Sequence, residues 1–450
     1  MTWLTTTLRG AAVAAVLVLG LVLGAAPALA VTVERVTSPG GVEAWLVQDH
    51  SIPIIAVSLA FRGGSALDPR DKAGLAEMVS SLLDEGAGEL DSQAFQQRLA
   101  DLSISLSFDG YKDTFRGGLR TLTRNRDQAF ELLRLALGEP RFDTEPVERI
   151  RSQIQTIIAR RANDPDYLVG RVFWTNIFGD HPYAMPRRGT AETVAAITID
   201  DLRNFADQRF ARDNLMLGVV GDITADELAT LLDATFGTLP ATSQPFSIPE
   251  AEIETKAEVI VVERDVPQST ITFGHKGLKR DDPDYYTAYI VNYILGGGGF
   301  SSRLYQKVRE ERGLAYSIGA YLSLWDHAGM VVGSVGTANE RVGESLDVIR
   351  SEWARMRDGD VSEQELADAK TYVTGSYPLR LSSTRSIARI LVAIQLEDLG
   401  IDYLDRRNSF IEAVTLDGVR RVARRLLDPD KLSVVIVGRP EGVEVTRVIN

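Results

Sequence analysis

The feature that most constrains the fold of this chain is an internal duplication. Residues 51–74 match residues 265–288 at a shift of 214 positions, and residues 210–221 match residues 427–438 at a shift of 217. The matched positions include a proline, a glycine and an Asp-Pro pair: Pro53 on Pro267, Gly63 on Gly277, and Asp68-Pro69 on Asp282-Pro283. A period of about 215 residues is far longer than a solenoid repeat, so each copy is expected to be a domain with its own core.

Each copy carries the pattern of a domain that mixes strands and helices. An alternating run typical of a strand comes first, at residues 54–61 and 269–275, and a helical segment follows, at residues 73–83 and 285–295. Long charged helices come later, at residues 144–162 and 362–374, and the second of these opens with a Ser-x-x-Glu capping box. We predict an α+β protein of two homologous duplicated domains, each an antiparallel sheet with helices packed on it.

The domain bounds follow from the repeat and from local composition. Residues 240–249 contain Pro245, two serines and few charges, a composition typical of a linker. The expected organisation is a signal peptide, an N-terminal domain, a linker and a C-terminal domain: residues 1–30, 31–240, 241–255 and 256–450, respectively.

The first thirty residues have the pattern of a secretory signal peptide. Arg9 precedes an apolar run at residues 11–24, and the small-residue site Ala28-Leu29-Ala30 follows. An uncleaved membrane anchor is the alternative, because about 20 apolar residues can span a bilayer. No later stretch approaches that length without a break. We therefore expect cleavage near Ala30 and an exported, periplasmic protein with no stable membrane insertion.

Composition excludes several classes of function. The chain has 49 Lys and Arg against 62 Asp and Glu, a net charge of −13 that argues against binding to nucleic-acid phosphates. The absence of cysteine excludes disulfides and thiolate metal sites. No two histidines lie within four residues of each other, so no helix face offers a His-x-x-x-His pair for zinc, and surface or capping roles are expected for all four: His50, His181, His275 and His327. No Gly-x-Ser-x-Gly motif nominates a serine nucleophile.

Four consecutive glycines at residues 296–299 are the most unusual local feature. The run lacks the Gly-Lys-Ser/Thr ending of a phosphate loop and follows a predicted helix, so a mobile loop or a helix stop is expected. An amphipathic helix comes next and should end at Gly313, and residues 315–322 alternate like a strand. On composition alone, Arg309 is a surface ion-pairing residue and Tyr316 a half-buried aromatic.

The stretch from Gly296 to Tyr316 resembles the C-terminal domain of the pitrilysin-like zinc peptidases. These are the inverzincins, a family that includes the mitochondrial processing peptidase and its bacterial relatives. The pattern is Gly-Gly-Gly, then Ser-Ser-Arg-Leu, then Arg-x-x-x-Gly-Leu-Ala-Tyr. Further matching motifs occur at residues 61–76, 178–190 and 214–222, so the resemblance covers essentially the whole mature chain. It implies a fold of the processing-peptidase type, in which two subunits close like a clam shell.

The resemblance also implies that the metal site of the family has been lost here. Active members bind zinc through His-x-x-Glu-His on a helix and a further glutamate downstream. The three motif positions hold Glu77, Ser80 and Ser81, and with Glu148 at the family's preceding acidic position, Gln155 stands at the downstream ligand position. A catalytic zinc requires three imidazole or carboxylate ligands and an open water position, and a base to take the proton of that water. We therefore expect no metal and no peptidase activity in this chain alone.

The C-terminal motif, by contrast, is intact. In the family, an arginine and a tyrosine seven residues apart hold the substrate and the tetrahedral intermediate, and the resemblance assigns these roles to Arg309 and Tyr316. A guanidinium and a phenol are suitable donors to a developing oxyanion. The glycine run Gly296, Gly297, Gly298 and Gly299 matches the loop linked with substrate handling in the family's non-catalytic subunits.

The resemblance implies a division of labour between two chains. This chain would be the non-catalytic, substrate-binding subunit of an exported heterodimeric zinc metallopeptidase acting on peptides. Its partner would be a homologous subunit that carries His-x-x-Glu-His and the zinc. The alternatives are a scaffolding protein and a peptide-binding chamber with no peptidase role, which would hold peptides by adding a strand to a sheet edge.

Overall fold

Each half of the chain forms a six-stranded sheet, and five of the six strands follow the same order in both; the outer strand is the first of its half in one sheet and the last in the other. The computed structural model describes residues 31–449, so the predicted signal peptide at residues 1–30 lies outside the described residues. The first sheet has the order β1-β2-β6-β3-β5-β4 and the second has the order β12-β7-β11-β8-β10-β9. The duplicated α+β fold expected from the sequence is confirmed.

The first sheet is built from residues of the N-terminal half. Its strands are β1 (Glu34–Thr37), β2 (Glu43–Gln48), β3 (Ile54–Arg62), β4 (Ser105–Gly110), β5 (Thr114–Leu122) and β6 (Leu215–Gly221). All neighbouring pairs are antiparallel except β2 and β6, which run parallel. This parallel pair is a difference from the purely antiparallel sheet of the prediction, and it arises because most of the half separates β2 from β6 along the chain.

The second sheet repeats this plan. Its strands are β7 (Glu258–Glu263), β8 (Gln268–Lys276), β9 (Ala315–Trp325), β10 (Ala328–Ala338), β11 (Ser433–Gly438) and β12 (Arg447–Ile449). Strands β7 and β11 run parallel, as β2 and β6 do, and β12 adds a second parallel pair at the edge. Strands β4 and β9 are the corresponding open edges of the two sheets.

Helices fill the connections between these strands. The N-terminal half contributes α2 (Leu75–Ser80), α3 (Ser92–Asp101), α4 (Arg126–Gly138), α5 (Thr144–Arg161), α6 (Pro165–Phe178), α7 (Ala191–Ala196), α8 (Ile199–Arg209) and α9 (Ala225–Phe236). The C-terminal half contributes α10 (Tyr285–Asn292), α11 (Val342–Arg357), α12 (Glu363–Gly375), α13 (Thr384–Leu396), α14 (Tyr403–Glu412) and α15 (Leu416–Leu426). Among the helices described, none has the length and the apolar composition that crossing a bilayer requires.

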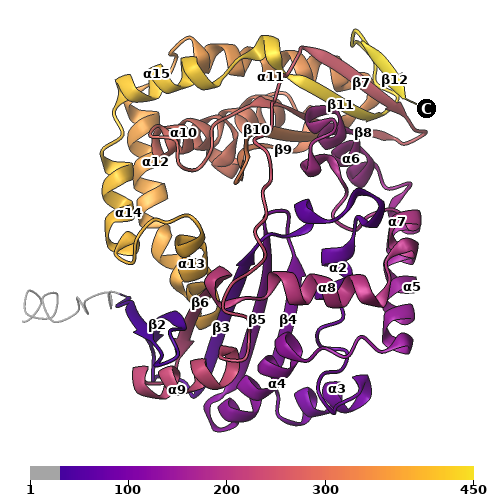
Figure 1. Cartoon of the computed structure of the whole chain (residues 1–450). Helices are drawn as coiled ribbons and strands as arrows, with labels where there is room; N and C mark the ends of the chain where they lie inside the picture. The colour runs from indigo at the N-terminus through magenta and orange to yellow at the C-terminus, as the bar shows by residue number, and fades with distance from the viewer. Residues whose placement is uncertain (1–30, 450) are drawn as a thin grey trace, which may run out of the picture. The chain divides into compact units, whose positions relative to one another are not determined.

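The two halves exchange one helix each. Residues Phe173 and Ile177 of α6, from the N-terminal half, pack in a core with strand residues of the second sheet such as Val332. In return, Val392 and Leu396 of α13 pack on the first sheet. Figure 1 shows α6 beside β8 and β11, and α13 beside β6.

This exchange explains why the central strands are apolar on both faces. In β3, Ile55, Val57, Leu59 and Phe61 point into the core of the N-terminal half, while the alternate residue Ala60 faces α13. Strand β11 alternates in the same way, since Val434 and Ile436 belong to the core of its own half, and Val435 and Val437 belong to the core shared with α6. The two halves are therefore packed together as one compact unit from Glu34 onward.

Candidate functional site

Helix α2 carries the positions where the resemblance places a zinc motif. It begins after Gly74, and the Asp68 carboxylate accepts hydrogen bonds from the backbone N–H groups of Gly74 (3.0 Å) and Ala76 (3.2 Å). Burial of this carboxyl raises the pKa of Asp68 to about 7. The whole helix is buried, and the side chain of Glu77 lies within the protein with 6% of the residue exposed.

Two arginines occupy the space around the Glu77 carboxylate. Arg187 Nε donates to Glu77 Oε2 at 2.9 Å, and Arg188 Nε lies 2.7 Å from Glu77 Oε1. Arg187 also contacts Asp109 of β4, with 3.3 Å between Nη2 and Oδ1. Each oxygen of the carboxylate thus has its own guanidinium partner, an arrangement that satisfies a buried charge.

Gly74 and Gly189 allow the backbone that carries the two arginines to lie close to the start of α2. Gly189 has a positive φ of +70°, and a Cβ atom added there would lie 1.9 Å from the carbonyl oxygen of Ala73. A Cβ atom on Gly74 would likewise lie 2.7 Å from the carbonyl oxygen of Arg188. Only glycine allows the backbone before α2 and the backbone after Arg188 to approach this closely.

The side chains at the other degenerate positions, Ser80, Ser81 and Gln155, donate hydrogen bonds to backbone carbonyl groups. The hydroxyl groups of Ser80 and Ser81 both donate to the carbonyl oxygen of Glu77, each at 2.9 Å. Gln155, on α5, donates from Nε2 to the carbonyl oxygen of Ala191 at 3.3 Å. Glu148 pairs with Arg151 on the protein surface. None of these side chains adds a carboxylate or imidazole to Glu77.

A zinc ion does not fit this arrangement. A structural or catalytic zinc takes imidazole, thiolate or carboxylate ligands, and Glu77 is the one such group among the four degenerate positions. Its two oxygens are engaged by guanidinium groups, which keep their charge at all accessible pH values and repel a cation. Across residues 31–449, no group of three or more His, Cys, Asp or Glu side chains is placed to hold a metal. Arg187 and Arg188 were not predicted as partners of Glu77, and the one signal of them in the sequence is that they are consecutive.

Arg309 and Tyr316 lie together, although seven positions separate them. Arg309 belongs to a π-helical segment (Tyr305–Glu310), and Tyr316 lies near the start of β9. The guanidinium carbon of Arg309 is 4.7 Å from the ring centre of Tyr316 and 4.8 Å from that of Tyr305, within cation–π range. Arg309 also donates to the Tyr305 hydroxyl group. Tyr316 is 80% exposed, which corrects the half-buried position expected from composition.

A turn at Gly313 produces this contact. The φ angle of Gly313 is +60°, and the N–H groups of Gly313 and Leu314 donate to the carbonyl oxygens of Arg309 (2.8 Å) and Val308 (2.9 Å). The helix end and the strand start are thereby held side by side. The sequence predicted the end of the helix by Gly313 and the strand after it. Tyr316 faces solvent, and the partly exposed Arg309 has N–H groups beyond the one it gives to Tyr305, so both can donate hydrogen bonds to a bound group.

The glycine run differs from the expected loop. Helix α10 ends at Asn292, but a π-helical turn (Tyr293–Gly297) continues it, and a short 3₁₀ helix (Gly299–Ser301) follows. Gly296 is buried against β9, and a Cβ atom added there would lie 2.7 Å from both the Cβ and the N of Ala320. Of the two alternatives expected here, the helix stop is what the structure shows, since the helical segment ends at Gly297. Gly296 and Gly297 are not a loop, and close packing on β9 requires glycine at residue 296.

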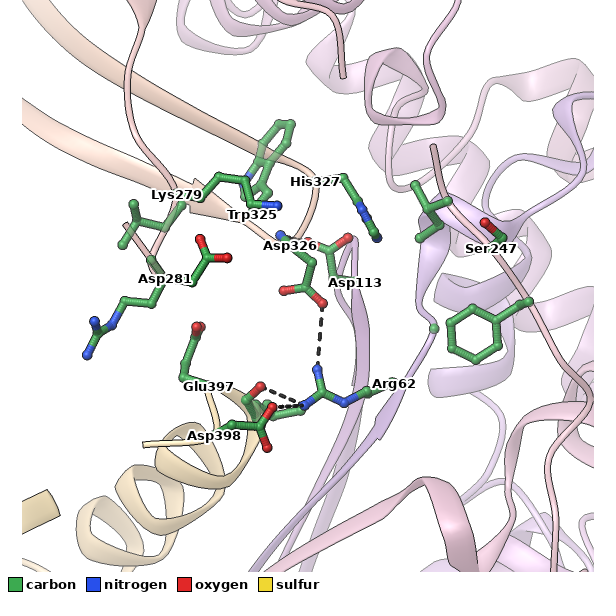
Figure 2. A pocket seen from close by; sticks show the side chains of 16 residues that line it. Arg62, Asp113, Ser247, Lys279, Asp281, Trp325, Asp326, His327, Glu397 and Asp398 are labelled. Carbon is green, nitrogen blue, oxygen red and sulfur yellow. Dashed lines mark hydrogen bonds and ion pairs between the residues drawn. The ribbon is translucent and has the colours of Figure 1, made fainter. Parts of the chain in front are cut away.

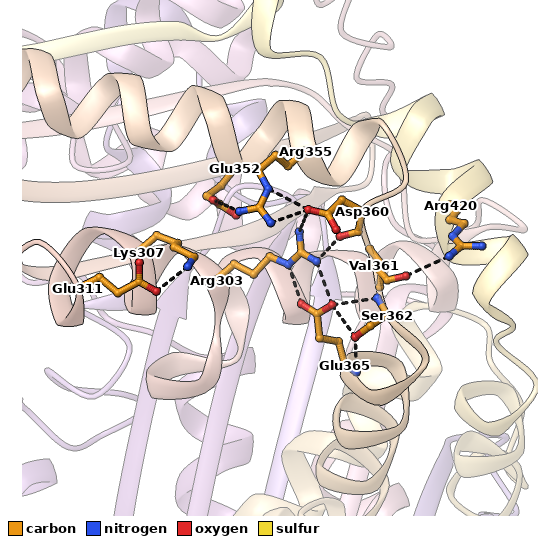
Figure 3. A network of polar contacts seen from close by, with 10 residues as sticks. All are labelled: Arg303, Lys307, Glu311, Glu352, Arg355, Asp360, Val361, Ser362, Glu365 and Arg420. Atoms are coloured by element: carbon orange, nitrogen blue, oxygen red, sulfur yellow. Dashed lines mark hydrogen bonds and ion pairs between the residues drawn. The ribbon is translucent and has the colours of Figure 1, made fainter.

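An ion-pair network fixes the helix that carries Arg309. Arg303 donates through Nε and Nη2 to the two oxygens of Glu365, at 2.7 and 2.9 Å, and also to the backbone carbonyl of Asp360. Arg355 pairs with Asp360 (2.6 Å) and with the buried Glu352 (2.8 Å). Figure 3 shows these contacts converging on the start of α12. Bidentate pairing of this kind is geometrically specific and holds the segment in one position.

The histidines are structural, but one of them is not at the surface. His275 is 2% exposed, which corrects the expected surface or capping role. Its Nε2 accepts a hydrogen bond from Trp353 Nε1 at 3.0 Å, and Nδ1 lies 2.8 Å from the carbonyl oxygen of Lys276. Burial lowers the pKa of His275, so the ring is held neutral. His181 Nε2 lies 2.8 Å from the carbonyl oxygen of Pro249 and thus joins α6 to the linker region.

Carboxylates gather at a cavity of about 430 Å³ between the two halves. Figure 2 shows Arg62 at its centre, with Nη2 donating to the Leu396 carbonyl oxygen at 2.7 Å and lying 3.6 Å from Asp398. The Oδ2 atom of Asp326, from the hairpin between β9 and β10, lies 3.9 Å from Nη1 of Arg62. Burial raises the pKa of both Asp326 and Glu397. Arg62 therefore joins the first sheet to two segments of the C-terminal half.

Comparison with known proteins agrees with this description. The family model described as the peptidase M16 inactive domain matches residues 196–373. A protein of Helicobacter pylori named non-peptidase homolog YmxG is 29% identical over 337 residues, which cover 74% of this chain and 77% of that protein. The uncharacterized zinc protease YmxG of Bacillus subtilis is 24% identical over 398 residues, which cover 88% and 96% of the two chains.

A solved structure extends the match to nearly the whole chain. The peptidase M16 inactive domain from Pseudomonas fluorescens superimposes with a TM-score of 0.85 and 26% identity, covering 93% of this chain and 100% of that one. The fold is shared with a Helicobacter pylori protease as well, at a TM-score of 0.81 and 18% identity over 91% and 100% of the two chains. Residues 196–373 therefore match the peptidase M16 inactive domain, and the whole chain is similar in sequence and in fold to proteins of that kind.

Proposed function

We propose that this protein is the non-catalytic, substrate-binding subunit of an exported heterodimeric zinc peptidase. In this proposal a homologous partner with an intact His-x-x-Glu-His motif supplies the zinc and the general base. This chain supplies Arg309 and Tyr316, which hold the peptide and stabilise the tetrahedral intermediate.

The observation that carries the proposal is the geometry of the Arg309–Tyr316 pair. The tyrosine is 80% exposed, and the arginine, whose side chain is 30% exposed, lies against its ring at 4.7 Å. An exposed aromatic side chain that orders a guanidinium contributes little to the stability of its own subunit. The pair is instead suited to donating hydrogen bonds to a group on another molecule.

The two open sheet edges support the peptide part of the proposal. Strand β4 is the edge of the first sheet, and its residue Asp109 contacts Arg187 beside Glu77. Strand β9 is the edge of the second sheet and begins next to Tyr316. An extended peptide can add to such an edge through main-chain hydrogen bonds, which does not require a metal. The sequence of residues 1–30 supports export.

Peptidase assays with a co-exported homologue that carries His-x-x-Glu-His test the proposal. A denatured, internally quenched fluorescent protein is the substrate. We expect no cleavage by this chain alone, and cleavage in the mixture that a chelator abolishes. Chelator-sensitive cleavage by this chain alone would contradict the assignment of Glu77 and its neighbours.

The variant Arg309→Ala separates the proposal from a scaffolding or purely peptide-binding role. Loss of one donor to a developing oxyanion typically costs about 2.7–4 kcal/mol, and since Arg309 is partly exposed we expect at least a tenfold fall in kcat/KM of the mixture. Arg439→Ala is the matched control, because Arg439 pairs with Asp265 at an exposed site of the same half. Equal activity of the two variants in a normal complex would favour a scaffold.

A further inference from the structure

A cavity with a mixed aromatic and basic lining lies beside the degenerate metal position. It has a volume of about 530 Å³, in the range of small-molecule sites, and is lined by parts of α5, α6 and residues 183–188. Trp325, from the C-terminal half, lines it as well. Arg187 and Arg188, the partners of Glu77, belong to the same lining.

Two cationic side chains of this cavity, Lys112 and Arg171, donate hydrogen bonds to neighbouring backbone carbonyl groups. The Lys112 ammonium donates to the carbonyl oxygen of Met185, and Arg171 Nη1 donates to the carbonyl oxygen of the preceding residue, Ala184, at 2.8 Å. Because these two carbonyls belong to consecutive residues, the two positive groups converge on one region of the cavity wall. Both carry donors beyond those that these bonds use.

Neither cation has a carboxylate within 4 Å among residues 31–449, although acidic groups are near. The Asp68 carboxylate is directed to the backbone N–H groups before α2, and Asp113 accepts from the Tyr183 hydroxyl group and from the N–H of Asp326. Asp164 caps α6 through the N–H groups of the following turn. Burial lowers the pKa of Lys112 to about 8; the charge of Asp68 opposes this shift, the charge of Arg171 adds to it, and burial lowers the pKa of Arg171 as well. A bound anion would relieve this repulsion.

The remaining wall is aromatic and aliphatic. The rings of Trp174 and Trp325 lie 4.9 Å apart, and Tyr183 packs edge-on against Trp325 at 4.6 Å. Tyr167 and Ile157 extend the same surface. A compact inorganic anion would leave this apolar surface uncovered, whereas a carboxylate attached to an apolar group would meet both the cations and the rings.

We propose that this cavity binds the C-terminal carboxylate of a peptide that ends in an apolar or aromatic residue, with Lys112 and Arg171 holding the carboxylate and Trp174 and Trp325 holding the side chain. The assignment deepens the proposed function and relies on it for the peptide nature of the ligand. In this assignment the subunit recognises the C-terminal end of a peptide rather than an internal sequence.

Binding to the full chain alone, without a partner subunit, tests the assignment. Two of the five tryptophans line the cavity, so intrinsic fluorescence reports occupancy, and calorimetry gives the affinity. The ligands are N-acetyl-Ala-Phe with a free carboxylate, the same dipeptide as its C-terminal amide, 3-phenylpropionate and inorganic phosphate. We expect the free acid to bind at least tenfold more tightly than each of the other three, since a charge-assisted contact and the apolar contact act together.

Single substitutions of lining residues test whether the ligand binds in this cavity. Lys112→Gln and Arg171→Gln should each weaken binding of the free acid by about tenfold or more and leave binding of the amide unchanged. Arg171→Lys should retain part of the preference for the acid over the amide. Arg160→Gln is the control, because Arg160 is an exposed neighbour on α5 outside the cavity lining. Circular dichroism melting confirms that each variant is folded, and Arg171→Lys remains informative if Arg171→Gln does not fold.

Several outcomes would overturn the assignment. Equal affinity for the acid and the amide would remove the role of the carboxylate, and equal affinity for phosphate would remove the role of the apolar wall. Equal affinity for 3-phenylpropionate would assign the cavity to free aromatic acids instead of peptide ends. Since no cleavage is measured, these results are independent of the peptidase assays: carboxylate binding without any effect of Arg309→Ala would refute the proposed function alone.

Discussion

Replacing Glu77 by glutamine should destabilise the fold, because its buried carboxylate forms an ion pair with two arginines. Both oxygens of its carboxylate contact a guanidinium, at 2.9 and 2.7 Å. The variant Glu77→Gln keeps the shape of the side chain and removes its charge. Two arginines would then face each other in a buried region without their shared counter-charge.

The magnitude follows from the exposure of the partners. Breaking a buried ion pair from one side typically costs about 3–5 kcal/mol, since it leaves an uncompensated charge. Here each arginine side chain is 31% exposed, and Arg187 keeps Asp109 at 3.3 Å. Water and the second carboxylate reduce the cost, so we expect the free energy of unfolding to fall by about 2 kcal/mol.

Urea denaturation followed by tryptophan fluorescence measures this change. With an m-value of about 3 kcal/mol/M, the expected loss lowers the midpoint by roughly 0.7 M. Glu148→Gln is the matched control: the same change of charge at a side chain that is 60% exposed and paired at 3.3 Å with Arg151. It should alter stability by less than about 0.5 kcal/mol. Equal midpoints for the two variants would refute the structural role of Glu77.

Restoring the motif residues alone, as Glu77→His, Ser80→Glu and Ser81→His together, should not restore zinc, because Gln155 adds no carboxylate and Arg187 and Arg188 remain next to the site. Elemental analysis after dialysis should find well under one zinc per chain, and a stoichiometric amount would contradict the fit described here. The free energy of unfolding should also decrease as the pH falls, because burial lowers the pKa of His275 from 6.5 in the folded state. Its contribution is fully present above pH 6.5 and is lost as the pH falls below that value, at most about 1.4 kcal/mol per pH unit. His275→Gln should flatten the dependence of Tm on pH between 7 and 5, and an unchanged slope would assign the effect to other groups.

Much of the secondary structure could be predicted because it follows from local patterns. The alternation at residues 54–61 and 269–275 became β3 and β8, each one or two residues longer than expected. The charged segment at residues 144–162 became α5, and the Ser362–Glu365 capping box opens α12 as predicted. The turn that joins Arg309 to Tyr316 was also local, since it depends on Gly313 alone among nearby residues.

The candidate site was only half visible in the sequence. The family resemblance nominated Arg309 and Tyr316, and their contact spans one turn between a helix and a strand. The partners of Glu77 lie 110 and 111 positions away, and no period or spacing relates them to α2. Lys112 and Arg171 likewise come from different segments, so their convergence in one cavity depends on how α6 packs.

The duplication, the strands and long helices of each half, and the absence of a closely spaced histidine pair could be predicted from the sequence, because they depend on residue identity and short-range pattern. The tertiary structure decided which helix covers which sheet: α6 packs on the second sheet and α13 on the first. It also decided that arginines surround Glu77. Apolar periodicity states that a face is buried without stating against what, and the partner of a buried charge is chosen by packing between segments distant in the chain.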